Sequence, residues 1–188
     1  MATETLTNFT YNELLEMPDD GRHYEILDGE LIVNAAPIPR HQVIAFNIAS
    51  ILRAYVRPRK TGTVFIAPID VVFTQEWVVE PDIIYIQKQR MSIVTRTNIS
   101  GAPDLAIEVL SDSTRKRDEI TKRRAYEDFG VGEYWIVDPE LESLKVFRRN
   151  DQGRYERVVE VSTEIAGSMI TSPLFPDLEI ALAEVFEE

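Results

Sequence analysis

Two acidic residues stand inside otherwise apolar runs, and their types and spacing are the ones best suited to chemistry. Asp82 lies in the segment EPDIIYI (80–86) and Glu108 lies in APDLAIEVLS (102–111). Burying a carboxylate among branched apolar side chains costs on the order of a few kcal/mol unless a partner compensates it. Two such carboxylates on successive strands predict a shared cation. Hard oxygen ligands of this kind suit the divalent metal of a phosphodiesterase.

The elements that must position these acids predict the fold class. Apolar spacing predicts a helix from His41 to Val56, ended by Pro58. A later basic helix is predicted from Thr114 to Phe129, with Gly130 as its C-cap. Three strands separate the two helices and one strand follows them. This order is typical of a mixed α/β (α+β) core, αβββαβ, in which helices flank a central mixed sheet. The strand segments fall at residues 63–73 (broken at Pro68), 79–86, 104–110 and 134–137.

Additional elements are expected at both ends of the chain. Asp28-Gly29 within HYEILDGELIV (23–33) predicts an N-terminal hairpin with a type I′ turn, preceded by a short helix at 11–17. Asn8 or Thr10 caps that helix. A C-terminal hairpin is expected over 144–148 and 155–161, followed by a docking tail with a short helix. Because no repeat, low-complexity tract or linker occurs, residues 1–188 are predicted to form a single domain.

The basic helix contains a lysine on its apolar side. Lys122 shares a stripe with Ala125, Tyr126 and Phe129, which follow it at helical spacing. Such a lysine either extends harmlessly to water or reaches the strand ends that carry Asp82 and Glu108.

Positive charge is concentrated around this lysine. Six of the ten residues from 115 to 124 are Lys or Arg. One interpretation is a solvated helix face that pairs with Asp118 and Glu119. The other is a phosphate-facing patch beside the paired carboxylates. The nucleic-acid-binding candidates are Arg115, Lys116, Arg117, Arg123 and Arg124.

Other polar residues are weaker candidates for a functional role. Glu25 on the first hairpin and Asp70 in APIDVVF (67–73) form a second tier, because a hydrogen-bonded or edge-exposed carboxylate explains each equally well. His41 opens a helix, where a role near the helix cap is more common than catalysis. The chain has only two histidines and no cysteine, which argues against a zinc site.

Composition limits the class of protein. A chain of 188 residues with 44% hydrophobic residues fits one globular domain. The absence of cysteine is compatible with a reducing cytoplasm, and the N-terminus shows no signal peptide pattern. No apolar stretch is long enough for a membrane span, so no membrane association is expected. The net charge of −12 argues against bulk electrostatic coating of nucleic acid, although a local basic groove is compatible with it.

Taken in order, several segments resemble a known family. They are YEILDGELIV, APIDVVF, EPDIIYI, APDLAIEVLSDSTRKRD, ITKRRAYEDFGVGEYWIVDP and PLFPDLEIALAEVF. This series resembles the bacterial Uma two family of restriction-endonuclease-like proteins within the PD-(D/E)XK nuclease superfamily. The resemblance implies a restriction-endonuclease-like core with Asp82 and Glu108 as the acidic pair. Leu110 replaces the superfamily's usual lysine, and the resemblance implies that Lys122 supplies it from the helix.

The residue types and the resemblance together imply a Mg²⁺- or Mn²⁺-dependent endonuclease acting on nucleic acid, with DNA as the expected substrate. Asp82, Glu108 and the backbone carbonyl of Val109 are the expected metal ligands. Lys122 is expected to orient or deprotonate the attacking water. Two alternatives stay open: a catalytically inactive nuclease fold that serves as a binding or assembly module, and an enzyme for a smaller phosphoester. A homodimer through the C-terminal hairpin is also compatible with the sequence.

Overall fold

A six-stranded sheet forms the centre of the computed structural model, which describes residues 8–18 and 20–188. Its strand order is β11-β10-β9-β8-β6-β3, and only the β8–β9 pair is parallel. The central strands β8 and β9 are buried along their whole length. The strands are β3 (Gly62–Ile66), β6 (Ile83–Gln87), β8 (Leu105–Val109), β9 (Glu133–Asp138), β10 (Ser143–Arg149) and β11 (Tyr155–Ser162).

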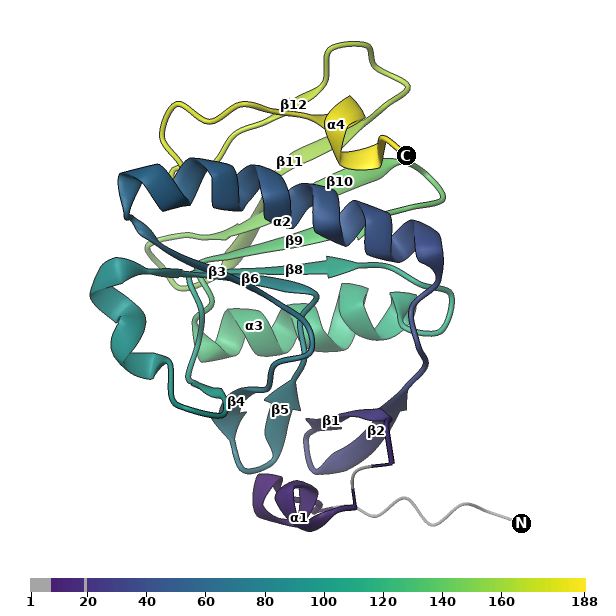
Figure 1. Cartoon of the computed structure of the whole chain (residues 1–188), viewed down its shortest axis with the longest axis vertical. Coiled ribbons are helices and arrows are strands. Elements are labelled where there is room, and N and C mark those ends of the chain that lie inside the picture. The colour runs from purple at the N-terminus through teal and green to yellow at the C-terminus, as the bar shows by residue number, and fades with distance from the viewer. Residues whose placement is uncertain (1–7, 19) are drawn as a thin grey trace.

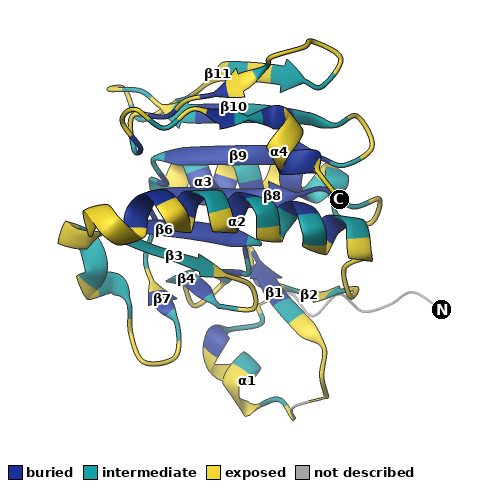
Figure 2. Ribbon diagram, turned by 45° about the horizontal axis from the view of Figure 1, so that its top comes forward, coloured by how far each residue is buried: buried dark blue, intermediate teal, exposed yellow. Residues whose placement is uncertain are grey.

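Helices cover both faces of this sheet. The long helix α2 (Pro39–Arg59) crosses one face, and α3 (Arg123–Phe129) lies against the other (Figure 1). Figure 2 shows the buried strands β8 and β9 between these two layers. The elements follow one another as α2, β3, β6, β8, α3 and β9, once the strands of a second sheet are set aside. This is the helix, three strands, helix, strand order predicted from the sequence.

The alternation of strand residues determines which side chains meet which helix. Ile107 and Val109 belong to the core under α2, where they join Ile44 and Leu52. Ala106 and Leu110 belong instead to the core on the α3 side, with Tyr126 and Tyr134 among others. Successive residues of a strand point to opposite faces, so Glu108 faces α3. The helix that carries the predicted lysine therefore packs over the face that carries Glu108.

The N-terminal hairpin belongs to a second sheet rather than being an appendage of the first. This sheet has the order β2-β1-β5-β4-β7, with β4 and β7 parallel. The predicted turn is present, because Asp28 and Gly29 have φ of 54° and 76°, as a type I′ turn requires. Thr10 caps α1 (Tyr11–Glu16) in a capping box with Glu13. The strands are β1 (His23–Leu27), β2 (Glu30–Asn34), β4 (Val71–Thr74), β5 (Trp77–Val79) and β7 (Ile99–Ser100).

Several predicted boundaries were wrong. Pro58 does not end the long helix, which continues to Arg59 and ends at Lys60 in a left-handed conformation. A proline in the last turn removes only one backbone hydrogen bond near a helix end. The segment predicted over 63–73 is divided between β3 and β4, which join different sheets. The strand predicted over 79–86 is β6, which starts only at Ile83, because Val79 is the last residue of β5.

The predicted basic helix also contains a π-helical segment, η2 (Arg117–Lys122), before α3 begins. Gly130 caps the C-terminus of α3 with φ of 89°, as predicted.

The C-terminal tail packs in the core under α2, which contains Ile170, Leu182 and Val185. The predicted C-terminal hairpin is β10–β11, and the tail forms β12 (Met169–Ile170), β13 (Ile180–Ala181) and α4 (Leu182–Phe186). A 3₁₀ segment, η1 (Lys88–Ile93), follows β6. Among the described residues, no helix combines the length and apolar character needed to cross a membrane.

Candidate active site

The register of β6 and β8 brings the two predicted acids together. Ile83 pairs with Ile107 and Ile84 with Ala106 in this antiparallel ladder, so continuing the register by one residue places Asp82 opposite Glu108. Both residues line one cleft of about 470 Å³. Glu108 is 4% exposed, whereas Asp82 is half-buried at the start of its strand.

Lys122 reaches this cleft from the other side and lies among three carboxylates. Its Nζ is 2.7 Å from Oε1 of Glu25, 3.0 Å from Oε1 of Glu108 and 3.4 Å from Oδ1 of Asp118. The longest of these contacts lacks hydrogen-bond geometry, because Oδ1 of Asp118 has no hydrogen-bond partner among the described residues. We call Glu25, Glu108, Asp118 and Lys122 the carboxylate–lysine cluster. All four residues are at most 4% exposed.

Local structure explains how η2 brings both charged groups inward. Asp118 and Lys122 are its two buried residues, and Ala125 and Tyr126 continue the buried stripe into α3. The Tyr126 hydroxyl donates a hydrogen bond of 2.7 Å to Oε1 of Glu108, the same oxygen that accepts from Lys122. Wide π turns are rare and are often found at functional sites.

Burial and mutual repulsion set the protonation of the cluster. Burial raises the pKa of Glu108 well above its usual value; Lys122 opposes that shift, while Asp118, Asp82 and Glu25 reinforce it. Burial also opposes ionisation of Glu25, yet Lys122 and the backbone N–H of Glu80 hold the pKa of Glu25 below its usual value. Glu25 is therefore the ionised partner of the lysine.

The lysine itself stays charged. Burial alone would lower the pKa of Lys122, but Glu108, Glu25 and Asp118 outweigh burial and raise this pKa well above its usual value. An ammonium in this position neutralises negative charge and donates hydrogen bonds; it is a poor proton acceptor.

Asp82 is fixed by two groups at the cleft edge. Its Oδ2 accepts a 2.7 Å hydrogen bond from the backbone N–H of Val109 and lies 3.2 Å from Nε2 of His41. Burial tends to lower the pKa of His41, but Asp82 and the backbone of Val109 raise it overall. His41, assigned to the helix cap from the sequence, is thus a buried partner of a site carboxylate.

Glu80 also belongs to the cleft, and its pKa is raised towards neutrality. Burial raises the pKa of Glu80 to about 7, and Asp70 and Glu25 add to the shift. Its carboxylate lies 3.3 Å from Nδ1 of His23, which also lines the cleft. Asp70, the other second-tier residue, instead accepts a hydrogen bond of 2.9 Å from the Tyr11 hydroxyl and does not line the cleft.

Sequence reasoning missed Asp118, His41, Glu80 and Tyr126 as site residues. One signal was available for Asp118, because it precedes Lys122 by four residues and so lies on the same helix face. That signal was interpreted as a surface ion pair. His41 and Glu80 gave no local signal, since their partners come from distant strands.

Comparisons with known proteins identify the family of the chain and a structure with a similar fold. The family model described as "Uma2: Putative restriction endonuclease" matches residues 11–183. The chain belongs to the Uma2 family. Its fold is similar to the crystal structure of a putative nuclease belonging to DUF820 from Anabaena variabilis ATCC 29413, with a TM-score of 0.78 and 20% sequence identity. That match covers 94% of this chain and 97% of the other. No curated protein matches the chain.

The predicted nucleic-acid-binding residues of this Uma2 family member do not form one free basic surface. Arg115 pairs with Asp138 and lies 3.0 Å from Glu140. Arg117 donates to the Asn34 side chain, and Arg123 lies over the Phe147 ring. Lys116 and Arg124 are exposed. The charge run is thus used largely to hold η2 and α3 against the sheet.

The donor set in this Uma2 site suits a divalent cation of the Mg²⁺ type. In the described part of the chain, hydrogen bonds to the acidic pair fall on Oδ2 of Asp82 and Oε1 of Glu108, which leaves one oxygen of each carboxylate for another partner. No group of three His, Cys, Asp or Glu side chains in that part of the chain forms a ready metal site. Mg²⁺ commonly takes only one or two carboxylates and completes its coordination with waters and substrate oxygens.

Proposed function

We propose that this Uma2 family member is a Mg²⁺- or Mn²⁺-dependent endonuclease that hydrolyses phosphodiester bonds of DNA on a restriction-endonuclease-like core. The observation that carries the proposal is the 3.0 Å contact between Lys122 and Glu108 in a cleft that Asp82 also lines. Two carboxylates and a lysine are the groups that a PD-(D/E)XK site requires, and here the lysine comes from a helix. The order of α2, β3, β6, β8, α3 and β9 supports the same core.

The ligands proposed for the metal are Asp82, Glu108 and the backbone carbonyl of Val109. A divalent ion held there would polarise a phosphoryl oxygen and lower the pKa of a bound water. The charged Lys122 stabilises negative charge on the phosphate and orients the water; its raised pKa argues against the proton-accepting role considered from the sequence. Glu25 is a positioning residue, because it holds Lys122 at 2.7 Å without lining the cleft.

A second candidate function is an inactive nuclease fold that serves as a binding or assembly module. The observation in its favour is that the ammonium of Lys122 already pairs with Glu25 and Glu108, so that these carboxylates have a cationic partner other than a metal ion. The net charge of −12 also favours protein partners over nucleic acid. The two candidates differ in whether Asp82 and Glu108 bind a divalent ion.

Incubation of the purified chain with supercoiled and single-stranded DNA at low salt tests the proposal. We expect weak cleavage with Mg²⁺ or Mn²⁺ and none with EDTA or Ca²⁺, since Ca²⁺ is larger and less able to polarise the phosphate. The Glu108→Ala variant, purified in parallel, is the control. Equal nicking by both proteins would expose a contaminant. Absence of cleavage together with absence of Mg²⁺ binding by calorimetry would favour the inactive module.

A further inference from the structure

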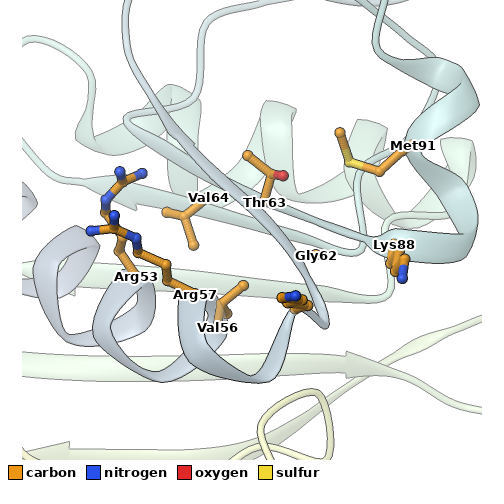
Figure 3. Close-up of a pocket in the computed structure, with 9 residues that line it drawn as sticks. Arg53, Val56, Arg57, Gly62, Thr63, Val64, Lys88 and Met91 are labelled. Atoms are coloured by element: carbon orange, nitrogen blue, oxygen red, sulfur yellow. The ribbon is translucent and has the colours of Figure 1, made fainter.

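A second pocket, of about 380 Å³, lies at the end of α2 opposite the candidate active site. Its walls come from the last turns of α2, the start of β3 and η1. Figure 3 shows Arg53 and Arg57 on one side, Lys88 and Met91 on the other, and Thr63 between them. Val56 is buried and contributes an apolar part of the lining.

All charged residues that line this pocket are positively charged. Four cations line it, and none of its nine lining residues is acidic. Within residues 8–18 and 20–188, none of the four forms an ion pair, although nine other Lys and Arg side chains do. All four are exposed. We call Arg53, Arg57, Lys60 and Lys88 the basic pocket.

Helix stability does not account for this grouping. Arg53, Arg57 and Lys60 follow one another at i, i+4 and i+7, which places like charges on one helix face and weakens the helix. Cations in the last turn are favourable near the negative end of a helix dipole, which explains Arg57 and Lys60 in part. That effect fades within one turn, so it explains neither Arg53 nor Lys88 on the separate segment η1. An anionic ligand accounts for all four.

Two elements connect the basic pocket with the candidate active site. Helix α2 contributes His41 to the cleft and Arg57 to the pocket. The edge strand β3 begins in the pocket at Gly62, and the chain just after it enters the cleft at Ala67. Five residues of strand span about 17 Å, and the sixteen helical steps from His41 to Arg57 span about 24 Å.

This separation matches the spacing of a nucleic-acid backbone. Phosphates of one DNA strand follow one another at about 3.4 Å along the duplex axis, so the distance from cleft to pocket corresponds to roughly five to seven nucleotides. Guanidinium and ammonium groups are the usual partners of such phosphates. An acidic protein segment offers no comparable reason for the pocket to lie on the same strand and helix as the cleft.

We propose that Arg53, Arg57, Lys60 and Lys88 bind backbone phosphates of a nucleic-acid strand several nucleotides away from the bond in the cleft. The substrate then runs along the β3 edge between α2 and η1. This inference rests on the proposed function for its substrate class, and it assigns the main binding surface to α2 and η1 rather than to residues 115–124.

The test is a binding measurement that does not depend on cleavage. Fluorescence anisotropy in EDTA follows the wild type and the double variants R53Q/R57Q and K60Q/K88Q on a duplex of about 20 base pairs, over a salt series. R154Q/R157Q is the matched control, because it removes two exposed arginines from the C-terminal hairpin. We expect each basic-pocket variant to reduce the salt slope by about 2, one for each lost phosphate contact, and the control to keep the wild-type slope.

The outcomes separate this inference from the proposed function. A smaller salt slope of duplex binding in the basic-pocket variants than in the wild type supports the inference, even if the chain cleaves nothing. Wild-type slopes in both variants would overturn it, even if the chain cleaves DNA. Failure of the wild type to bind duplex or single-stranded DNA at low salt would also overturn it. Equal displacement of the duplex by polyglutamate at matched charge would show a general anion surface and overturn the assignment to nucleic acid.

Discussion

Lys122 and Glu25 form the shortest of the three ion pairs of this lysine, 2.7 Å between Nζ and Oε1, although one residue lies on the first hairpin and the other on η2. Both side chains are almost completely buried. The pair therefore joins the second sheet to the helical layer over the central sheet, and it fixes the amine that faces Glu108.

Loss of this lysine should destabilise the fold. Lys122→Met leaves three buried carboxylates without their cation, and breaking a buried ion pair from one side costs about 3–5 kcal/mol. Urea unfolding should show this loss, whereas Lys116→Met, at an exposed position, should change little. The double variant Glu25→Gln/Lys122→Met should recover part of the loss. Unchanged stability of Lys122→Met would mean that the cluster is neutral without the lysine.

Cleavage should depend on three residues and not on a fourth. We expect Glu108→Gln and Asp82→Asn to abolish Mg²⁺-dependent nicking, and Lys122→Ala to lower it by about two orders of magnitude or more, in line with the loss of one positioned charge. Asp70→Asn is the control, since Asp70 contacts Tyr11 and does not line the cleft. Single-turnover rates on supercoiled DNA give the comparison, with circular dichroism to confirm folding. A defect in Asp70→Asn as large as in Asp82→Asn would count against the assignment.

Asp82 should also contribute to stability without metal. Its carboxylate accepts the Val109 N–H, so Asp82→Ala leaves a backbone donor unsatisfied and should cost about 1–3 kcal/mol. Asp82→Asn should cost less, because the amide oxygen can still accept that bond. If repulsion between Asp82 and Glu108 dominated instead, removing the Asp82 charge would leave the protein as stable as the wild type or more stable. Chemical unfolding in EDTA distinguishes the two, and equal stability of all three proteins would contradict the structural role.

The Arg115–Asp138 pair should make stability depend on acid pH. Burial opposes ionisation of Asp138, but Arg115 and the backbone N–H groups of Leu141 and Glu140 hold the pKa of Asp138 below its usual value of 3.8. A lowered folded-state pKa gives stability that is present above pH 3.8 and is lost as pH falls through the lower folded value. Asp138→Asn should therefore cost about 1.5–3 kcal/mol at pH 7, the range for hydrogen bonds to charged groups.

The same comparison at low pH provides the control for this pair. At a pH below the lowered folded-state pKa of Asp138, where both states of the wild type take up the proton, Asp138→Asn and wild type should converge in their unfolding midpoints. A difference that persists unchanged at that pH would mean that packing around the side chain, and not its charge, is responsible.

Local signals predicted the parts of this fold that short segments determine. The Asp28-Gly29 turn, the Thr10 cap and the Gly130 cap each depend on a few neighbouring residues, and each is present. The facing of Glu108 followed from the alternation of β8. In contrast, the assignment of β3 and β4, predicted as one interrupted segment over 63–73, to two different sheets depends on strands elsewhere in the chain.

The residues of the candidate site were likewise predictable where a local pattern marks them, and not where a distant partner does. The sequence indicated Asp82 and Glu108 as candidates because a charge in an apolar strand is conspicuous. It indicated Lys122 because this lysine interrupts an apolar helical stripe. Glu25 was ranked too low, since its partner lies on a distant element. The Arg115–Arg124 run was ranked too high, because sequence does not show that Asp138, Asn34 and Phe147 occupy three of its arginines.

The π turn of η2 makes the length of this segment more constrained than its composition. Each helical residue turns the chain by about 100°, so one residue inserted between Asp118 and Tyr126, which lie eight residues apart, would place them about half a turn apart on an α-helix. The two groups could then no longer both face Glu108. Substitutions at exposed positions such as Ile120 do not change which helix residues face Glu108. Among relatives, single-residue insertions should therefore be rare between Asp118 and Tyr126, even where the residues themselves vary.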